Sequence, residues 1–558
     1  MRRAPARTNW FTRAFIPSTC PTVTSWVFLH KRLLKLVHML TLAKTPLEQV
    51  LAGWWSRVDT AYKRAFYVVL LVNLLAFGFE MTNLTIDHDD LWEIFLEDDI
   101  LGHYIGRFAL GWIHLYTQGA HIMPFLQVAE GITVMTLYGL LVARVWGLTR
   151  TLDIVLVASV LCVFPYMAQV NSYNAVIVPY SIAHFLSAAA VALSIGTTRL
   201  RLAFAALLYV GAFLIYQSVI ANAATIFVVW LLTRILFDSR SGRLHVQELG
   251  RATIAAVLAV AAGGVLYVAI VKSWGVQFDS YQSADAAFNL EGRADILGGL
   301  SKVLVGTRAF FFWPEAYFPD YLKKLQLVLF LGAGVVCVWL PDGISKKAVA
   351  VLFLAAALFT PRLLQLLHPL GNFHNLTLTA YAVTVAGFVM ILTRGGNVLT
   401  RNLSAVLSVV LLGGYLIQAN WISTVNYLNT LAQYTTLTQI LARVRAIPNQ
   451  QWDGKRIVFI GELRMQPTYP FKPATGVATP YIGANLVGYL AKLMRDDLVV
   501  LPPEAVPKAS EYAAVHLPWP HPDSVAVVDG VGVVVLSNEQ LARQSQGAAD
   551  QPSPLFPK

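Results

Sequence analysis

Hydrophobic segments of similar length recur along most of the chain. Each is about 18 to 22 residues long, enough for an α-helix to cross roughly 30 Å of hydrocarbon. We therefore predict a mainly α, polytopic membrane protein with about eleven transmembrane helices in residues 65–421. The expected helices are 65–82, 124–143, 151–170, 175–195, 200–216, 219–237, 252–271, 324–340, 348–367, 375–393 and 402–421.

The boundary between the fifth and sixth helices is the least distinct. The apolar run over 200–237 is interrupted only around Tyr216 and Gln217. It forms either two short spans or one span followed by a re-entrant piece.

Basic residues gather in the short loops after alternate helices. With eleven helices, all of these loops lie on one side of the membrane, and the positive-inside rule makes that side the cytoplasm. The N-terminus falls on the same side, whereas loops 83–123 and 272–323 and the part after Trp421 fall outside. The basic residues are Arg144, Arg150, Arg199, Arg201, Arg240, Arg243, Arg251, Lys346, Lys347, Arg394 and Arg401.

Two further regions flank the helices. Residues 1–64 form a basic cytoplasmic arm, and 26–43 within it is expected to be an amphipathic helix on the membrane surface. Residues 422–558 form an external α/β domain. In this domain we expect a helix over 431–447, a strand over 456–461 and a hairpin over 524–537 that turns at Asp529-Gly530.

The composition agrees with a membrane protein, since 56% of the residues are hydrophobic and the mean hydropathy is +0.58. Orientation in the membrane and attraction to an anionic inner leaflet account for the net charge of +11, so no nucleic-acid partner is implied. The three cysteines have no spacing typical of a metal site or a disulfide framework.

The external loop 83–123 opens with the acidic stretch TIDHDDLWEIFLEDDI, in which seven of sixteen residues are Asp or Glu. One interpretation is a solvated helix whose acids keep the loop outside the membrane. It accounts poorly for the adjacent pair Asp89-Asp90, because neighbouring like charges repel each other. We therefore take the pair as catalytic and leave Glu97, Asp98 and Asp99 on the solvated face. The supporting residues are Asp87, His88 and Glu93.

Arg107 follows in a mostly apolar segment, GHYIGRFALGW (102–112). A cation at the external membrane surface is costly unless it meets an anion. Arg107 therefore extends to the headgroups, pairs with the nearby acids or binds a phosphate.

A carboxylate pair and an arginine at one membrane face suit glycosyl transfer from a lipid-phosphate-linked sugar. The leaving phosphate is a stable anion that needs a cation rather than a general acid. The acceptor hydroxyl needs a base, which one carboxylate supplies. The other carboxylate then stabilises oxocarbenium character, and direct attack inverts the anomeric carbon.

Other polar residues fall at the external ends of the expected helices. Tyr216, Gln217 and Trp112 are candidates for contacts with the sugar or the acceptor, although an interfacial belt also explains them. Arg362, near the external end of the ninth helix, is a second candidate ligand for the donor phosphate. Its alternative role is a salt bridge between helices.

Several motifs occur in a consistent order. Asp89-Asp90 precedes GRFALGW (106–112), FPYMAQ (164–169), IYQSVIANAA (215–224) and LPWPHPDSVAVVDGVGVVVLS (517–537). Their order and spacing resemble the bacterial Gtr type II family of O-antigen glucosyltransferases, in the GT-C superfamily of membrane glycosyltransferases.

This resemblance implies a polyprenyl-phosphate glucose donor and a lipopolysaccharide O-antigen acceptor, or another envelope glycan, at the periplasmic face of the inner membrane. A synthase and a flippase of the donor are then functional partners. No cofactor is obligatory and no metal site is expected, although a role for a divalent metal stays open. The rival hypotheses are a transporter or flippase of lipid-linked sugars, which predicts inverted repeats, and a structural or polymerase-type envelope protein.

Overall fold

A computed structural model gives the fold of most of the chain. The residues that it describes are 46–85, 102, 105–119, 121–196, 198–238, 246–276, 296–315, 317–367, 375–447, 452, 454–464, 481–483, 487 and 497–537. The chain separates into two compact units, Met1–Lys63 and Arg64–Lys558. In the first unit, α2 (Leu47–Arg57) is described, and the amphipathic helix expected over 26–43 lies outside the described residues.

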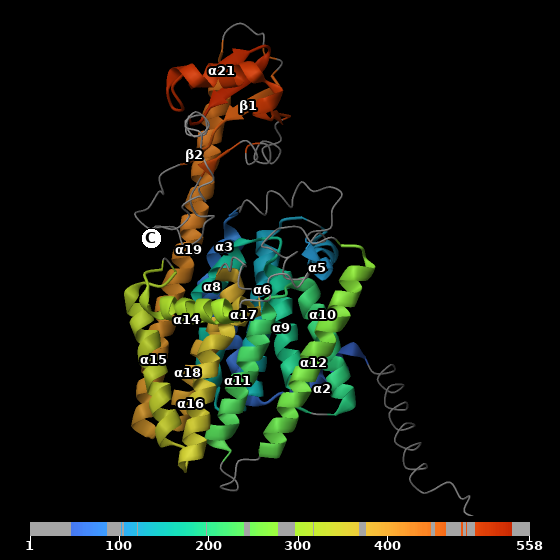
Figure 1. Cartoon of the computed structure of the whole chain (residues 1–558), viewed down its shortest axis with the longest axis vertical. Helices are drawn as coiled ribbons and strands as arrows, with labels where there is room; N and C mark the ends of the chain where they lie inside the picture. The colour runs from blue at the N-terminus through green and yellow to red at the C-terminus, as the bar shows by residue number, and fades with distance from the viewer. Residues whose placement is uncertain are drawn as a thin grey trace, which may run out of the picture. The chain divides into compact units, whose positions relative to one another are not determined.

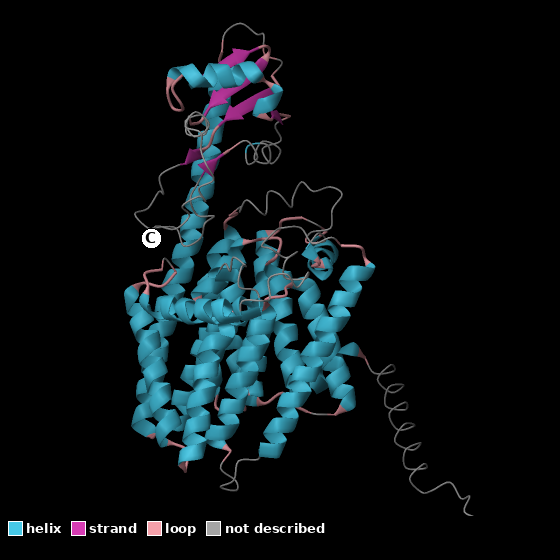
Figure 2. Ribbon diagram, viewed as in Figure 1, coloured by secondary structure: helices cyan, strands magenta, loops and turns pink. Residues whose placement is uncertain are grey.

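The second unit is dominated by long helices (Figures 1 and 2). Within the described residues, nine helical segments are long and apolar enough to cross a membrane, and a bent pair makes ten. The nine are α3 (Thr60–Thr82), α6 (Pro124–Val145), α9 (Ile177–Ser194), α11 (Val219–Phe237), α12 (Val246–Ser273), α15 (Asp320–Trp339), Ile344–Leu366, Asn375–Gly395 and α19 (Val398–Arg445).

The bent pair is α7 (Thr151–Cys162) and α8 (Pro165–Ser172), which meet at 54°. Pro165 explains the bend, because proline lacks the N–H of a helix interior and disfavours helical geometry in the preceding residue. The remaining expected segment, the fifth along the chain, is α10 (Arg199–Ile215), whose 17 residues are at the lower limit for a span. Each of the eleven apolar segments predicted from the sequence is therefore helical.

The doubtful boundary between the fifth and sixth segments is a real break. Tyr216 has φ −157° and ψ 105°, an extended conformation that ends α10, and α11 begins three residues later at Val219. The segment Ile344–Leu366 is also broken, because Pro361 lies in a 3-10 turn, η3 (Thr360–Arg362). This turn joins α16 (Ile344–Phe359) to α17 (Leu363–Leu367).

The helices differ in how much protein surrounds them. In the segment Asn375–Gly395, which comprises η4 (Asn375–Leu378) and α18 (Ala380–Gly395), 89% of the apolar window is buried, compared with 22% for Ile344–Leu366. The first lies in the bundle interior, and the second presents side chains such as Leu352 outward, as a lipid-facing helix does. Two shorter helices, α5 (Phe108–Gln118) and α14 (Ile296–Phe312), complete the bundle, and α14 runs across the long helices (Figure 1).

The last of the membrane-spanning helices, α19, is 48 residues long and carries the chain from the bundle into the C-terminal domain. It is fixed to α3 by hydrogen bonds from Asn420 Nδ2 to Leu75 O (2.8 Å) and from Ser423 Oγ to Glu80 Oε1 (2.8 Å). The helix expected over 431–447 is therefore the continuation of the eleventh span, and the expected domain boundary at 421/422 falls inside one helix.

The C-terminal domain contains a four-stranded sheet in the order β4-β1-β6-β5. Strand β1 pairs in parallel with β4 and β6, and β5 and β6 form the expected antiparallel hairpin with Asp529 and Gly530 at positive φ in its turn. A separate two-stranded ladder joins β2 to β3. The strands are β1 (Arg456–Ile460), β2 (Leu463–Arg464), β3 (Tyr481–Ile482), β4 (Val499–Leu501), β5 (Val525–Val528) and β6 (Val531–Val535).

Alternation along β1 gives the sheet two apolar faces. Ile457 and Phe459 share a buried cluster with the end of α19, including Leu441. Val458 and Ile460 share another with Ala509 of α21 (Pro507–Val515). Helices thus cover both faces, as parallel strands require.

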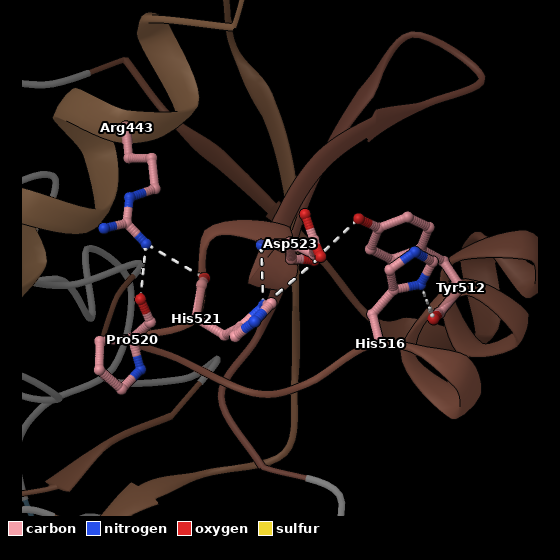
Figure 3. A network of polar contacts seen from close by, with 6 residues as sticks. All are labelled: Arg443, Tyr512, His516, Pro520, His521 and Asp523. Atoms are coloured by element: carbon pink, nitrogen blue, oxygen red, sulfur yellow. Dashed lines mark hydrogen bonds and ion pairs between the residues drawn. The ribbon is translucent and has the colours of Figure 1, made fainter.

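A proline-rich segment over 516–523 ties these helices together (Figure 3). Arg443 of α19 donates from Nη1 to Pro520 O (2.9 Å) and His521 O (3.2 Å), and its guanidinium lies over the Trp519 ring. On the other side, Tyr512 of α21 donates to Asp523 O (2.8 Å). The network fixes the segment between α19 and α21.

Candidate functional site

Arg107 is presented by a tight glycine turn immediately before α5. Gly102 O accepts hydrogen bonds from Ile105 N (3.2 Å) and Arg107 N (2.9 Å). Gly102 and Gly106 have φ of +75° and +72°, which glycine adopts without the steric cost of a Cβ. A Cβ at Gly102 would also lie 3.0 Å from Arg107 Cβ. The turn therefore fixes the backbone from which the arginine side chain extends.

Three side chains from distant parts of the chain orient the Arg107 guanidinium. Nε donates to Gln217 Oε1 (2.9 Å) and Nη1 donates to Tyr180 OH (3.3 Å). The Tyr216 ring lies under the guanidinium at 5.0 Å and stacks on the Tyr180 ring at 4.2 Å between centroids. These three partners are neutral, and together they hold the guanidinium in place.

The break between α10 and α11 supplies two of these partners. Because the chain leaves α10 in an extended conformation at Tyr216, the next side chain, Gln217, can turn toward α5. Gln217 Nε2 donates to Ile105 O (3.1 Å) and to Tyr267 OH (2.8 Å) of α12. One amide therefore links the arginine turn, the helix break and α12. The structure thus brings together three residues singled out from the sequence: Arg107, Tyr216 and Gln217.

The start of the acidic stretch is fixed close by. Asn174 Nδ2, in the turn before α9, donates to Thr85 O (2.6 Å), and both residues are buried. Tyr180, which contacts Arg107, lies six residues further along, in the first turn of α9. The acidic stretch and the arginine are therefore attached to the same short segment, Asn174–Tyr180.

The predicted catalytic pair and its neighbours lie outside the described residues. This applies to Asp87, His88, Asp89, Asp90 and Glu93, as well as to Glu97–Asp99. The nearest described residue that precedes them in the chain is Thr85, the first residue of the acidic stretch.

Trp112 lies one turn beyond Phe108 on α5, in an aromatic cluster. Its ring centroid is 6.4 Å from that of Phe108 and 5.5 Å from that of Trp274, at the end of α12. Phe108 and Trp274 are 4.9 Å apart. Trp274 is about half exposed, so the cluster forms an aromatic surface beside the Arg107 turn.

Arg362, the other predicted phosphate ligand, lies in the η3 break. Nε donates to Tyr381 OH (2.8 Å) and Nη1 donates to Gln365 Oε1 (3.0 Å). The alternative of a helix–helix salt bridge is not observed, because no carboxylate of the described residues lies within 4 Å of this guanidinium.

An ion pair that the sequence did not reveal lies near Arg362. Glu315, after α14, accepts from Tyr166 OH (2.7 Å) and pairs with Lys323 Nζ at 3.6 Å. Burial raises the pKa of the Glu315 carboxyl, while the Tyr166 hydrogen bond and the charges of Lys323 and Arg362 oppose the rise. Burial thus outweighs the stabilising contacts at this carboxyl.

Sequence reasoning missed Tyr180, Tyr267 and Asn174, as well as this ion pair. Their only signal in the sequence is a polar or aromatic residue near the end of an apolar segment, which is common in membrane helices. Among the described residues there is also no group of three or more His, Cys, Asp or Glu side chains arranged to hold a metal ion.

These contacts define what the site can do chemically. An oriented guanidinium presents a planar fork that matches a phosphate or a carboxylate. A nearby anchored acidic stretch can supply a base, and the aromatic surface can contact a lipid or a sugar ring.

Comparison with protein families gives one match. The family model described as Glucosyl transferase GtrII matches residues 78–392, which is more than half of the chain. The matched range contains the acidic stretch, the Arg107 turn, the α10–α11 break and Arg362, and it ends within α18. A search of curated proteins found no match to the chain.

Proposed function

The chain belongs to the GtrII family of glucosyltransferases, and on this premise we propose that it transfers glucose from polyprenyl phosphate to a glycan hydroxyl. The acceptor is lipopolysaccharide O-antigen or another envelope glycan, and the reaction takes place on the periplasmic face of the bacterial inner membrane. The anomeric configuration is inverted.

One observation carries the choice of residues: Thr85 and Arg107 are both attached to the segment Asn174–Tyr180. Four residues of chain span at most about 14 Å, so the Cα of Asp89 lies within that distance of the Cα of Thr85. The candidate base and the candidate phosphate ligand are therefore both tethered to one short segment of the chain.

In the proposed reaction, the bond between the sugar C1 and the phosphate oxygen breaks, and its electron pair stays on the phosphate. Arg107 stabilises the lipid phosphate that departs, through charge-assisted hydrogen bonds. Gln217 and Tyr180 hold the guanidinium beforehand, so little reorganisation is needed when charge develops.

The acceptor hydroxyl forms the new bond to C1 from the opposite face and gives its proton to one carboxylate of the pair Asp89-Asp90. The second carboxylate stabilises the oxocarbenium character of the transition state. In this scheme, Trp112, Tyr216 and Gln217 contact the sugar or the acceptor. The scheme requires no nucleotide at the site, and it depends on a synthase and a flippase for the donor.

The positions of the basic residues support the proposed orientation. Arg199 and Arg201 begin α10, whereas Tyr216 follows its last residue. Similarly, Lys346 and Lys347 lie in the first turn of α16, whereas Arg362 follows its end. By the positive-inside rule, the ends that carry Tyr216 and Arg362 face the periplasm.

The test compares Arg107→Ala, Arg107→Lys and the wild type in membranes that contain polyprenyl-phosphate glucose. We expect Arg107→Ala to lose transfer mainly through weaker donor binding and a poorer leaving group. Arg107→Lys should recover little, because a point charge does not reproduce a bidentate fork. Arg201→Ala, at the opposite end of α10, is the control. Wild-type turnover in Arg107→Ala would refute the role given to this residue.

A further inference from the structure

We propose that Arg362 is the centre of a second anion site, which binds a phosphate of a lipid-linked substrate in addition to the site at Arg107. The inference rests on the proposed function, since it concerns the substrates of the same enzyme.

The first support is that Arg362 is buried, and no carboxylate of the described residues lies within 4 Å of its guanidinium. It is 9% exposed, and it contacts the Tyr381 hydroxyl, the Tyr381 ring at 5.6 Å and the Gln365 amide oxygen, all of them neutral. Glu315, the carboxylate whose pKa Arg362 influences, is already bound by Tyr166 and Lys323. Glu315 is thus the acid for two buried cations, Lys323 and Arg362, which leaves a net positive charge that is costly to bury. An anion that arrives with a ligand would balance this charge.

The second support is that the surroundings are shaped to hold the guanidinium. A Cβ at Gly306 of α14 would lie 2.5 Å from Arg362 Cζ, so any larger residue there would displace the guanidinium from this position. Tyr381, whose hydroxyl accepts from Arg362, donates in turn to Thr307 Oγ1 (3.4 Å) and stacks on Phe310 at 3.9 Å with an interplanar angle of 4°. Residues from α14, α17 and α18 thus hold the arginine in one orientation.

The third support is the position of the site in the bundle. Thr360 of η3 accepts from Thr225 Oγ1 (2.9 Å) in the first third of α11, the helix that begins beside Gln217. Arg362 and Arg107 are therefore found toward the same end of α11. Figure 1 shows α5 and α17 at this same end of the bundle. Two cations on one face can bind one phosphate together or two separate anionic groups.

The chemistry of the ligand follows from the donor set. A planar guanidinium with neutral neighbours favours phosphate, which it can bind through two parallel hydrogen bonds. Two sources of phosphate are available in a reaction between lipid-linked substrates. One is the donor monophosphate, which would then contact both arginines, and the other is the pyrophosphate of a lipid-linked acceptor glycan.

The experiment measures binding rather than turnover. The full chain is placed in phosphatidylcholine nanodiscs, and the affinities for a short polyprenyl monophosphate and a short polyprenyl pyrophosphate are measured by thermophoresis. The variants are Arg362→Gln, Tyr381→Phe, which keeps the charge but removes the anchoring hydroxyl, and Gly306→Ala, which displaces the guanidinium. Arg308→Gln is the matched control, because Arg308 is an exposed arginine on α14, two residues after Gly306. Thermal stability of each variant shows whether it is folded.

We expect Arg362→Gln to weaken binding of one lipid about tenfold or more, as loss of a charge-assisted hydrogen bond does, with smaller losses for the other two variants. Weaker monophosphate binding assigns the site to the donor, and weaker pyrophosphate binding assigns it to the acceptor. Wild-type affinities for both lipids in folded Arg362→Gln would overturn the inference, and so would a wild-type chain that binds neither lipid. The proposed function is judged separately, by glucose transfer and its loss in Arg107→Ala.

Discussion

Arg107 and Gln217 are 110 residues apart in the chain and are joined by a hydrogen bond of 2.9 Å from Nε to Oε1. Gln217 reaches the arginine because the helix breaks just before it, at Tyr216. The same amide donates to the carbonyl of the turn that presents Arg107. The glutamine therefore positions both the backbone and the side chain of the proposed phosphate ligand.

Substitution of Gln217 should impair donor binding. Gln217→Leu removes a hydrogen bond to a charged group and should raise the donor KM about tenfold. Gln217→Glu should be worse, because its carboxylate would pair with Arg107 and compete with the phosphate. Steady-state kinetics with polyprenyl-phosphate glucose distinguish the two variants, with exposed Gln247→Leu as the control. Equal donor KM values in all four proteins would show that Gln217 has only a packing role.

The Asn174–Thr85 hydrogen bond should matter for turnover more than for donor binding. Asn174→Leu removes the donor to Thr85 O and frees the start of the acidic stretch, so we expect kcat to fall about tenfold while the donor KM changes little. Asn83→Ala is the control, because the Asn83 side chain donates to Phe79 O and Thr82 Oγ1, at the end of α3. A fall in thermal stability without a change in kcat would make Asn174 a purely structural residue.

Reporter fusions test the orientation of the chain. Fusions after Gly147, Gly242 and Gly395 should report the cytoplasm, and fusions after Asp279 and Gln451 should report the periplasm. A C-terminal tail on the cytoplasmic side would contradict both the count of eleven spans and the proposed face of the reaction.

Much of the fold could be predicted because membrane spans and tight turns have local signatures. Each apolar run became a helix, and the Asp529-Gly530 pair gave the expected hairpin. The continuity of α19 was missed, although a signal existed: no glycine or proline occurs between Gly414 and Pro448. The higher content of polar residues after Trp421 suggested a domain boundary there, but α19 continues through this position.

The site was less predictable because its contacts are between distant residues. Arg107 and Gln217 could be singled out as polar residues at helix ends, but their pairing depends on how α5, α10 and α12 pack. The roles of Tyr180 and Asn174 depend on the same packing. Glu315 and Lys323 are eight positions apart in an aromatic-rich segment, and only the fold brings Tyr166 to the same carboxylate.

Sugar transfer by variants of the acidic stretch tests the central claim most directly. Membranes that contain the wild type, Asp89→Asn, Asp90→Asn or the triple variant Glu97→Gln/Asp98→Asn/Asp99→Asn are given polyprenyl phosphate carrying labelled glucose, and label in the envelope glycan is measured. We predict transfer by the wild type, a loss of roughly 10² to 10⁴ in rate for the variant that lacks the base, and at least about a tenth of the wild-type rate for the triple variant. Wild-type rates in both single variants together with an inactive triple variant, or no transfer by the wild type from this donor, would contradict the account.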